Sequence, residues 1–124
     1  MNTKHHVSLS IAKQLAEAGI VIESEFWWSQ PIQNEWSISY RSYTKEINGV
    51  AREYYPAPIA TELLERLPDG WRYGVNLVKL MSGYGVELTD YTPMPYKRLE
   101  FIQDKNPCDA LALLLIRLTK DGLI

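Results

Sequence analysis

The run Asn106-Pro107-Cys108-Asp109, which continues as ALALLLIRLTKDG to Gly122, predicts the central helix of this protein. Asn106 is a good N-cap, and Pro107 suits the first turn, where no intrahelical partner awaits an N–H. Asp109 adds negative charge near the helix N-terminus, which the helix dipole favours. Gly122 suits the left-handed conformation that commonly ends a helix. We therefore expect a helix between Asn106 and Gly122.

This helix is expected to be apolar on two sides. At about 100° per residue, one stripe carries Leu111, Leu114, Leu115 and Leu118. Leu113 and Ile116 lie on roughly the opposite side. One side should pack on a sheet, while the other needs a second helix or a partner subunit. The run is too short to cross a membrane, which takes about 20 apolar residues.

Composition bounds the class of protein. The chain of 124 residues suits one domain, residues 1–124, with a real core. A net charge of −2 argues against a protein that binds nucleic acid mainly by electrostatics, although a local basic face stays possible. The only cysteine, Cys108, excludes an intramolecular disulfide and a multi-cysteine metal site. The N-terminus has no apolar segment typical of a secretory signal, so we expect a cytoplasmic protein.

The remaining elements follow from periodicity and from turn signals. Two further helices are expected at Val7–Gly19 and Pro58–Leu67. Asn48-Gly49 is a strong hairpin signal and should pair Tyr43–Ile47 with Val50–Tyr54. Other strands are expected at Glu23–Gln30, Glu35–Tyr43, Trp71–Met81 and Val86–Tyr91, with a short one possible at Arg98–Ile102. Gly83-Tyr84-Gly85 should be the turn that reverses the chain after Met81.

This order of elements favours an α+β fold. Strands joined by hairpins favour antiparallel pairing. We therefore expect two layers, with one antiparallel sheet of about four to five strands and three helices mainly on one face. The order of the strands in the sheet does not follow from the sequence.

Several segments resemble a group of short bacterial proteins. The segments are Phe26-Trp27-Trp28, Arg41-Ser42-Tyr43, Glu53–Ala57 running into Glu62–Pro68, and Asn106-Pro107 with Asp109–Ala112. In this order they are similar to uncharacterised proteins encoded by phages, prophages and other mobile elements, notably of gut bacteria. The resemblance covers most of the chain and implies a genomic setting. It implies no activity and supplies no catalytic residues.

The aromatic residues give the most informative site signal. If Phe26 and Trp28 face the core, Trp27 must point the other way, because side chains alternate along a strand. On the expected open face it would lie near Arg41 and Arg72, where it could anchor a protein interface or stack a nucleic-acid base. The alternative is that the N-terminal segment or the Pro93–Tyr96 crossing covers Trp27.

Other chemically capable residues are better explained as structure. Cys108 would lie at a helix N-terminus, where a thiol pKa falls, but no histidine is near it in sequence to act as a base. His5-His6 lacks the spacing of a metal site and reads as a solvated terminus. Glu23 with Glu25, and Glu62 with Glu65, are expected on solvated faces. We predict no catalytic residue, no cofactor and no metal.

The sequence thus favours a small, non-enzymatic protein that works by protein–protein contact, with a homodimer as one option and without membrane association. The candidate interface residues are Trp27, Arg41 and Arg72 on the sheet face, and Leu113 and Ile116 on the last helix. The alternative is weak single-stranded nucleic-acid binding by the same aromatic and arginine face. The partner, the biological process and the oligomeric state do not follow from the sequence.

Overall fold

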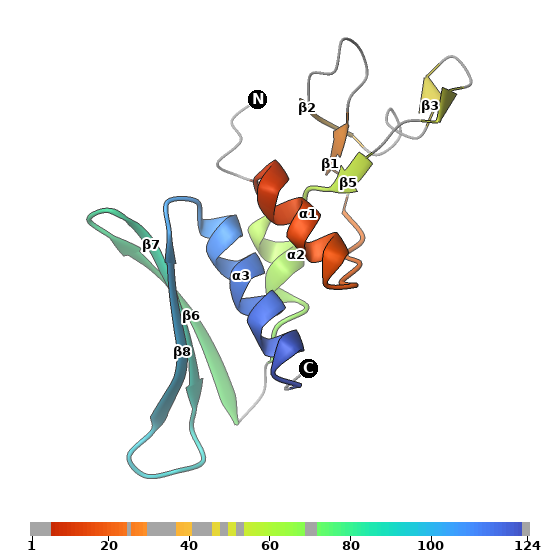
Figure 1. Ribbon diagram of the computed structural model, residues 1–124. Coiled ribbons are helices and arrows are strands. Elements are labelled where there is room, and N and C mark those ends of the chain that lie inside the picture. Colours follow the sequence, from red (N-terminus) through yellow and green to blue (C-terminus); the bar gives the residue numbers. More distant parts are fainter. Residues whose placement is uncertain are drawn as a thin grey trace.

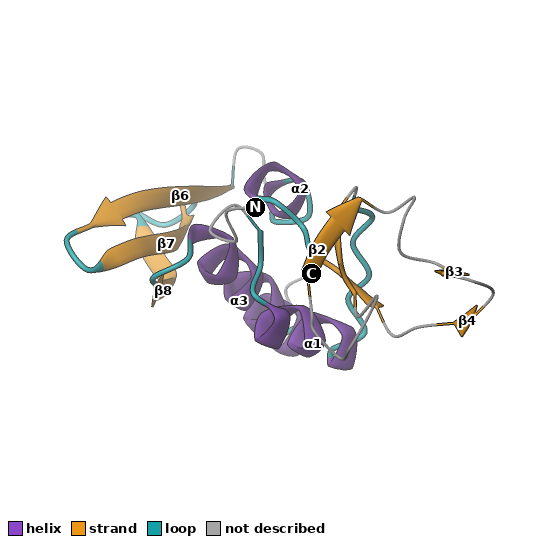
Figure 2. Cartoon of the chain, turned by 90° about the horizontal axis from the view of Figure 1, so that it is seen from above, coloured by secondary structure: helices purple, strands orange, loops and turns teal. Residues whose placement is uncertain are grey.

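The structure, a computed structural model, describes residues 6–24, 26–29, 37–40, 46–47, 50–51, 54–68 and 72–122. In these ranges the chain forms three helices and eight antiparallel strands, so the α+β class is confirmed. The helices lie between two small sheets (Figures 1 and 2).

Helix α3, Pro107–Lys120, is the centre of the fold. The Asn106 side chain caps it by accepting a hydrogen bond from the Cys108 N–H at 2.9 Å. Gly122 follows its end with a φ of 74°, in the left-handed region. The stripe expected to face the core is buried in full: Leu111, Leu114, Leu115 and Leu118.

One face of α3 packs on a three-stranded meander of β6 (Tyr73–Leu80), β7 (Gly83–Asp90) and β8 (Lys97–Asp104) (Figure 1). Val86, Leu88 and Ile102 are buried in the core beneath it. Leu80 pairs with Gly83, so Met81 and Ser82 form the turn. The expected turn at Gly83-Tyr84-Gly85 is therefore wrong: these residues belong to β7, where the Phe101 ring lies so close over Gly85 that an added Cβ would meet it at 2.7 Å.

The second sheet has the order β2 (Ser37–Tyr40), β1 (Phe26–Ser29), β5 (Tyr54–Pro56). A separate two-stranded ribbon pairs β3 (Glu46–Ile47) with β4 (Val50–Ala51). This pairing confirms the inner part of the expected hairpin, whereas Tyr54 belongs to β5 and pairs with Ser29 instead. Asn48 and Gly49 lie outside the described residues.

The expected single sheet of four to five strands is wrong, because the strands divide among separate sheets. Helix α2 (Ala60–Leu64) follows β5 after only three residues and packs on α3. The chain thus crosses the helix layer before β6 begins, and β6 to β8 form on the other side of it (Figures 1 and 2). Helix α1 (Leu9–Glu17) also packs on α3. The second side of α3 is therefore covered by helices of its own chain.

Residues 6–8 join the N-terminal part of the chain to the start of α3. The Asn106 Nδ2 group donates to the His6 carbonyl at 2.8 Å, and the Ser8 N–H donates to Asp109 Oδ1 at 2.6 Å. The Val7 carbonyl accepts from the Trp28 indole at 2.8 Å. His6 is buried with its ring 4.6 Å from that of Phe26, so the solvated terminus expected at this residue is wrong. Its neighbour His5 lies outside the described residues.

Candidate functional site

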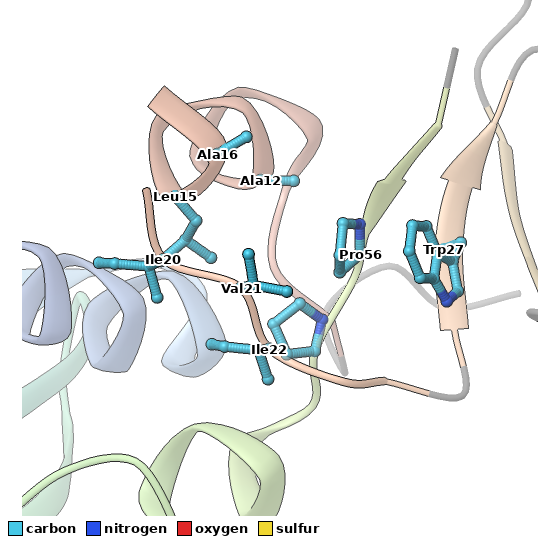
Figure 3. Close-up of a pocket in the computed structure, with 9 residues that line it drawn as sticks. Ala12, Leu15, Ala16, Ile20, Val21, Ile22, Trp27 and Pro56 are labelled. Atoms are coloured by element: carbon cyan, nitrogen blue, oxygen red, sulfur yellow. The ribbon is translucent and has the colours of Figure 1, made fainter. Parts of the chain in front are cut away.

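An apolar groove of about 220 Å³ lies between α1, the segment that follows it, and strands β1 and β5 (Figure 3). Nine residues line it: Ala12, Leu15, Ala16, Ile20, Val21, Ile22, Trp27, Pro56 and Pro58. None of them carries a titratable side chain. The groove is therefore suited to apolar contact and offers no acid, base or nucleophile of its own.

The helix end explains how the aliphatic wall of the groove is built. Gly19 follows the C-cap of α1 and has a φ of 76°, in the left-handed region. The next residue, Ile20, donates its N–H to the Leu15 carbonyl at 3.0 Å. This return of the chain buries Ile20 and Ile22. Because side chains alternate in an extended segment, Val21 points outward and is 72% exposed. Arg66 holds this segment by donating to the Val21 carbonyl at 2.6 Å.

Trp27 forms the far wall of the groove, with Pro56 as its neighbour (Figure 3). Its indole N–H donates to the Ser24 carbonyl at 3.0 Å, which fixes the plane of the ring. The Ser24 hydroxyl in turn donates to Glu62 Oε1 at 2.7 Å and accepts from the Phe26 N–H at 3.1 Å. The half-buried ring is thus held in place by hydrogen bonds within its own chain.

The expected side-chain directions on β1 are confirmed, because Trp28 is in the core and Phe26 packs against it. The structure does not bring Trp27 and Arg72 together, however. Trp27 belongs to the sheet of β1, β2 and β5, whereas Arg72 precedes β6 in the other sheet. Arg72 lies 3.6 Å from Asp90 and over the ring of Tyr73. Arg41 lies outside the described residues.

The two candidate residues on α3 are less accessible than the sequence suggested. Ile116 is 6% exposed and Leu113 is half-buried. Both border a shallow hollow of about 190 Å³ together with Gln14, Arg117 and Lys120. Since α1 and α2 cover α3 within the chain, Ile116 has little surface to offer a partner.

The titratable groups near the start of α3 are structural. Burial raises the pKa of the Cys108 thiol to about 11, and the neighbouring Asp109 charge adds to the effect. Such a thiol stays protonated at neutral pH and is a poor nucleophile.

Glu62, on α2, also departs from the expected solvated face, because its carboxylate accepts from the Ser24 hydroxyl and from the Ile59 N–H. Among the described residues, no group of three metal-ligating side chains comes together.

Sequence reasoning missed the part of the groove formed by Val21 and Pro56. The available signal was the run Ile20-Val21-Ile22 directly after Gly19, where burial of the outer two residues must expose the middle one. The partner strand could not be inferred, because Trp27 and Pro56 meet only through long-range pairing.

Within the described part of the chain, no helix is long and apolar enough to cross a membrane. The sequence matches no protein-family model, and no curated protein and no solved structure shows significant similarity to it. The groove is therefore the feature on which a functional proposal rests.

Proposed function

We propose that this chain is a small, non-enzymatic interaction module that holds an apolar side chain of a partner protein in the groove beside Trp27. The observation that carries the proposal is that the exposed Val21 lines the same groove as an indole fixed by its hydrogen bond to the Ser24 carbonyl. An accessory role for a phage or mobile element, in the cytoplasm, completes the proposal and rests on the sequence alone.

The size and chemistry of the groove favour a side chain over a free ligand. Sites for drug-sized molecules enclose roughly 300–1,000 Å³ and include a few placed polar groups. The groove is smaller, at about 220 Å³, and its lining residues are aliphatic apart from Trp27. Tryptophan in a well-packed apolar depression is typical of the residues that dominate protein–protein binding energy. A leucine, methionine or phenylalanine side chain of a protein partner is the occupant we propose.

The test is a pull-down from a lysate of the source cell with the tagged chain, with and without nuclease. It compares the wild type with Trp27→Ala and Val21→Asp, and uses Met94→Asp as a matched control. Met94 is also an exposed apolar residue but lies in the loop between β7 and β8, away from the groove. We expect one protein to be retained by the wild type and by M94D in both conditions, and to be lost with both groove variants.

Titration with the purified partner then measures how much each substitution weakens binding. Removal of an interface tryptophan typically costs about 2 kcal/mol or more, so W27A should raise Kd by at least about thirtyfold. Equal retention by the groove variants and the wild type would sink the groove as the interface. A large fall in the melting temperature of W27A would show that Trp27 is mainly a structural residue, and V21D would then have to carry the test.

Weak binding of single-stranded nucleic acid is the second candidate. The observation that favours it is the Arg98 guanidinium, 5.2 Å from the centre of the Phe101 ring on the β6–β8 sheet. Its support is weaker, because Arg98 lies 3.3 Å from Glu87 and Arg72 lies 3.6 Å from Asp90. The candidate predicts that a fluorescently labelled single-stranded oligonucleotide binds, with an affinity that falls steeply as salt rises.

A further inference from the structure

The two edge strands of the β6–β8 sheet differ in how well they are protected against pairing with a strand of another molecule. Strand β8, KRLEFIQD, carries four charged residues, and its pairing with β7 contains an irregularity at Leu88/Thr89. Strand β6, YGVNLVKL, carries one charge, Lys79, has no proline, and pairs with β7 without a register shift. Charges, prolines and bulges are the usual means by which proteins keep edge strands from pairing. The β6 edge lacks most of this protection.

Strand β6 also exposes aliphatic side chains on both faces of the sheet. Leu77, on the α3 side, is 42% exposed because α3 packs on β7 and β8. Val78 points to the opposite face and is 43% exposed. Among the described strands only β7 pairs with β6.

The register shows which backbone groups face the open edge. The Tyr91 N–H donates to the Arg72 carbonyl at 2.8 Å, next to the Tyr73↔Asp90 pair. Hydrogen-bonded and non-hydrogen-bonded pairs alternate along an antiparallel ladder, so the even-numbered residues of β6 bond to β7. The N–H and C=O groups directed away from β7 are therefore those of Tyr73, Val75, Leu77 and Lys79.

We propose that two copies of this chain pair antiparallel along β6 and form one continuous sheet across a two-fold axis. This pairing goes beyond the proposed function, because it does not use the groove beside Trp27. The residues whose backbone groups point away from β7 must bond to the same four residues of the second copy. A register centred on Asn76 pairs all four of them within the strand. It places Tyr73 opposite Lys79 of the second copy, and Val75 opposite its Leu77.

The sequence of β6 complements itself in this register, which is why the occupant is a second copy. The two Lys79 charges lie at opposite ends of the new ladder, and each is opposite a Tyr73 side chain and not a second lysine. Val75 and Leu77 form apolar cross-strand pairs at the centre, which add to the backbone hydrogen bonds. The Asn76 residues face each other at a non-hydrogen-bonded position, where Cα atoms lie about 4.5 Å apart.

The first test is sedimentation equilibrium of the full chain over a range of concentrations. The wild type should dimerise, and Leu77→Lys should raise the dimer Kd by about tenfold or more, because it places a charge in an apolar pair. Gln103→Lys is the matched control, since it adds the same charge to an exposed position on the other edge strand, β8, and should leave Kd unchanged. Circular dichroism melting checks that each variant is folded.

Oxidative cross-linking tests the register. Asn76→Cys should form a disulfide between copies, because the expected Cα separation of about 4.5 Å lies within the range for a disulfide. Val78→Cys should not, since each Val78 would face Gly74 and the two cysteines would lie roughly 13 Å apart along the strand. The buried Cys108 does not compete for the disulfide.

Dimerisation that weakens in L77K but not in Q103K, with cross-linking of N76C alone, would support the pairing. A wild type that stays monomeric at every concentration would overturn it, even if another protein adds a strand to β6. A dimer that persists in a folded L77K, or that cross-links through V78C and not N76C, would overturn the site and register. None of these results depends on whether the groove beside Trp27 binds a partner.

Discussion

Asp109 is a carboxylate that the fold buries at the start of α3. It accepts the Ser8 N–H, from a residue 101 positions away, and so ties the N-terminal segment to the central helix. Burial raises the pKa of this carboxyl above its ordinary value of 3.8, and the hydrogen bond from Ser8 opposes the shift only in part. The helix dipole favours the charge by about 0.3–1 kcal/mol, which is less than the cost of removing a carboxylate from water.

This shift predicts how Asp109→Asn changes stability with pH. A carboxyl whose pKa is raised by folding stabilises the protein below its unfolded pKa, and this stabilisation is lost as pH rises through the folded pKa. D109N keeps an oxygen to accept the Ser8 N–H but has no charge to bury. Urea unfolding across pH should show that D109N gains stability relative to the wild type as pH rises from below 3.8 toward neutrality. If the wild type instead became more stable relative to D109N over this pH range, the raised pKa of Asp109 would be contradicted.

The side-chain caps of α1 and α3 differ in hydrogen-bond length, so their removal should cost different amounts of stability. Asn106 accepts the Cys108 N–H at 2.9 Å and also donates to the His6 carbonyl at 2.8 Å. Ser8 accepts the Ile11 N–H at a longer 3.4 Å. Loss of a cap costs about 0.5–2 kcal/mol, so Asn106→Ala should lie at the upper end of this range and Ser8→Ala at the lower end. Urea denaturation measures both, and an equal or larger loss for S8A would contradict the ranking.

Elements with local signals could be predicted from the sequence, and their assembly could not. The cap at Asn106 and the apolar stripe of α3 depend on neighbours within one or two turns, so the sequence predicted them correctly. The turn at Met81-Ser82 was missed because Gly83 and Gly85 are stronger turn signals, although Gly85 is needed for close approach of the Phe101 ring. The division of the strands among separate sheets depends on which distant strands pair, and alternation in the sequence does not contain that information.

The candidate site shows the same limit. The sequence correctly predicted, from alternation along the strand, that Trp27 points away from the side of Phe26 and Trp28. The expected proximity of Arg72 to Trp27 was wrong, because the two residues belong to different sheets and so cannot share a face. His6 was placed in solvent for lack of any local signal, whereas its burial arises from contacts with residues 20 and 100 positions away.

At the scale of the whole molecule, α3 connects parts that would otherwise lack a core. It contacts β7 and β8 on one side and α1 and α2 on the other. The sheet that carries Trp27 and Trp28 reaches α3 through α1, α2 and residues 6–8 (Figure 1). A loss of packing in α3 should therefore destabilise the sheets on both sides of the helix layer.

Leu111→Ala tests this coupling, because Leu111 is fully buried in α3. We expect a loss of about 2–5 kcal/mol in the free energy of unfolding, as for other buried leucines. Tryptophan fluorescence and far-UV circular dichroism should give coincident transitions before and after the substitution, since one core supports both sheets. Leu64→Ala is the matched control: this leucine on α2 is 40% exposed, and its loss should cost about 0.5 kcal/mol or less. Two separate transitions in L111A would instead show that the sheets unfold independently and that α3 does not couple them.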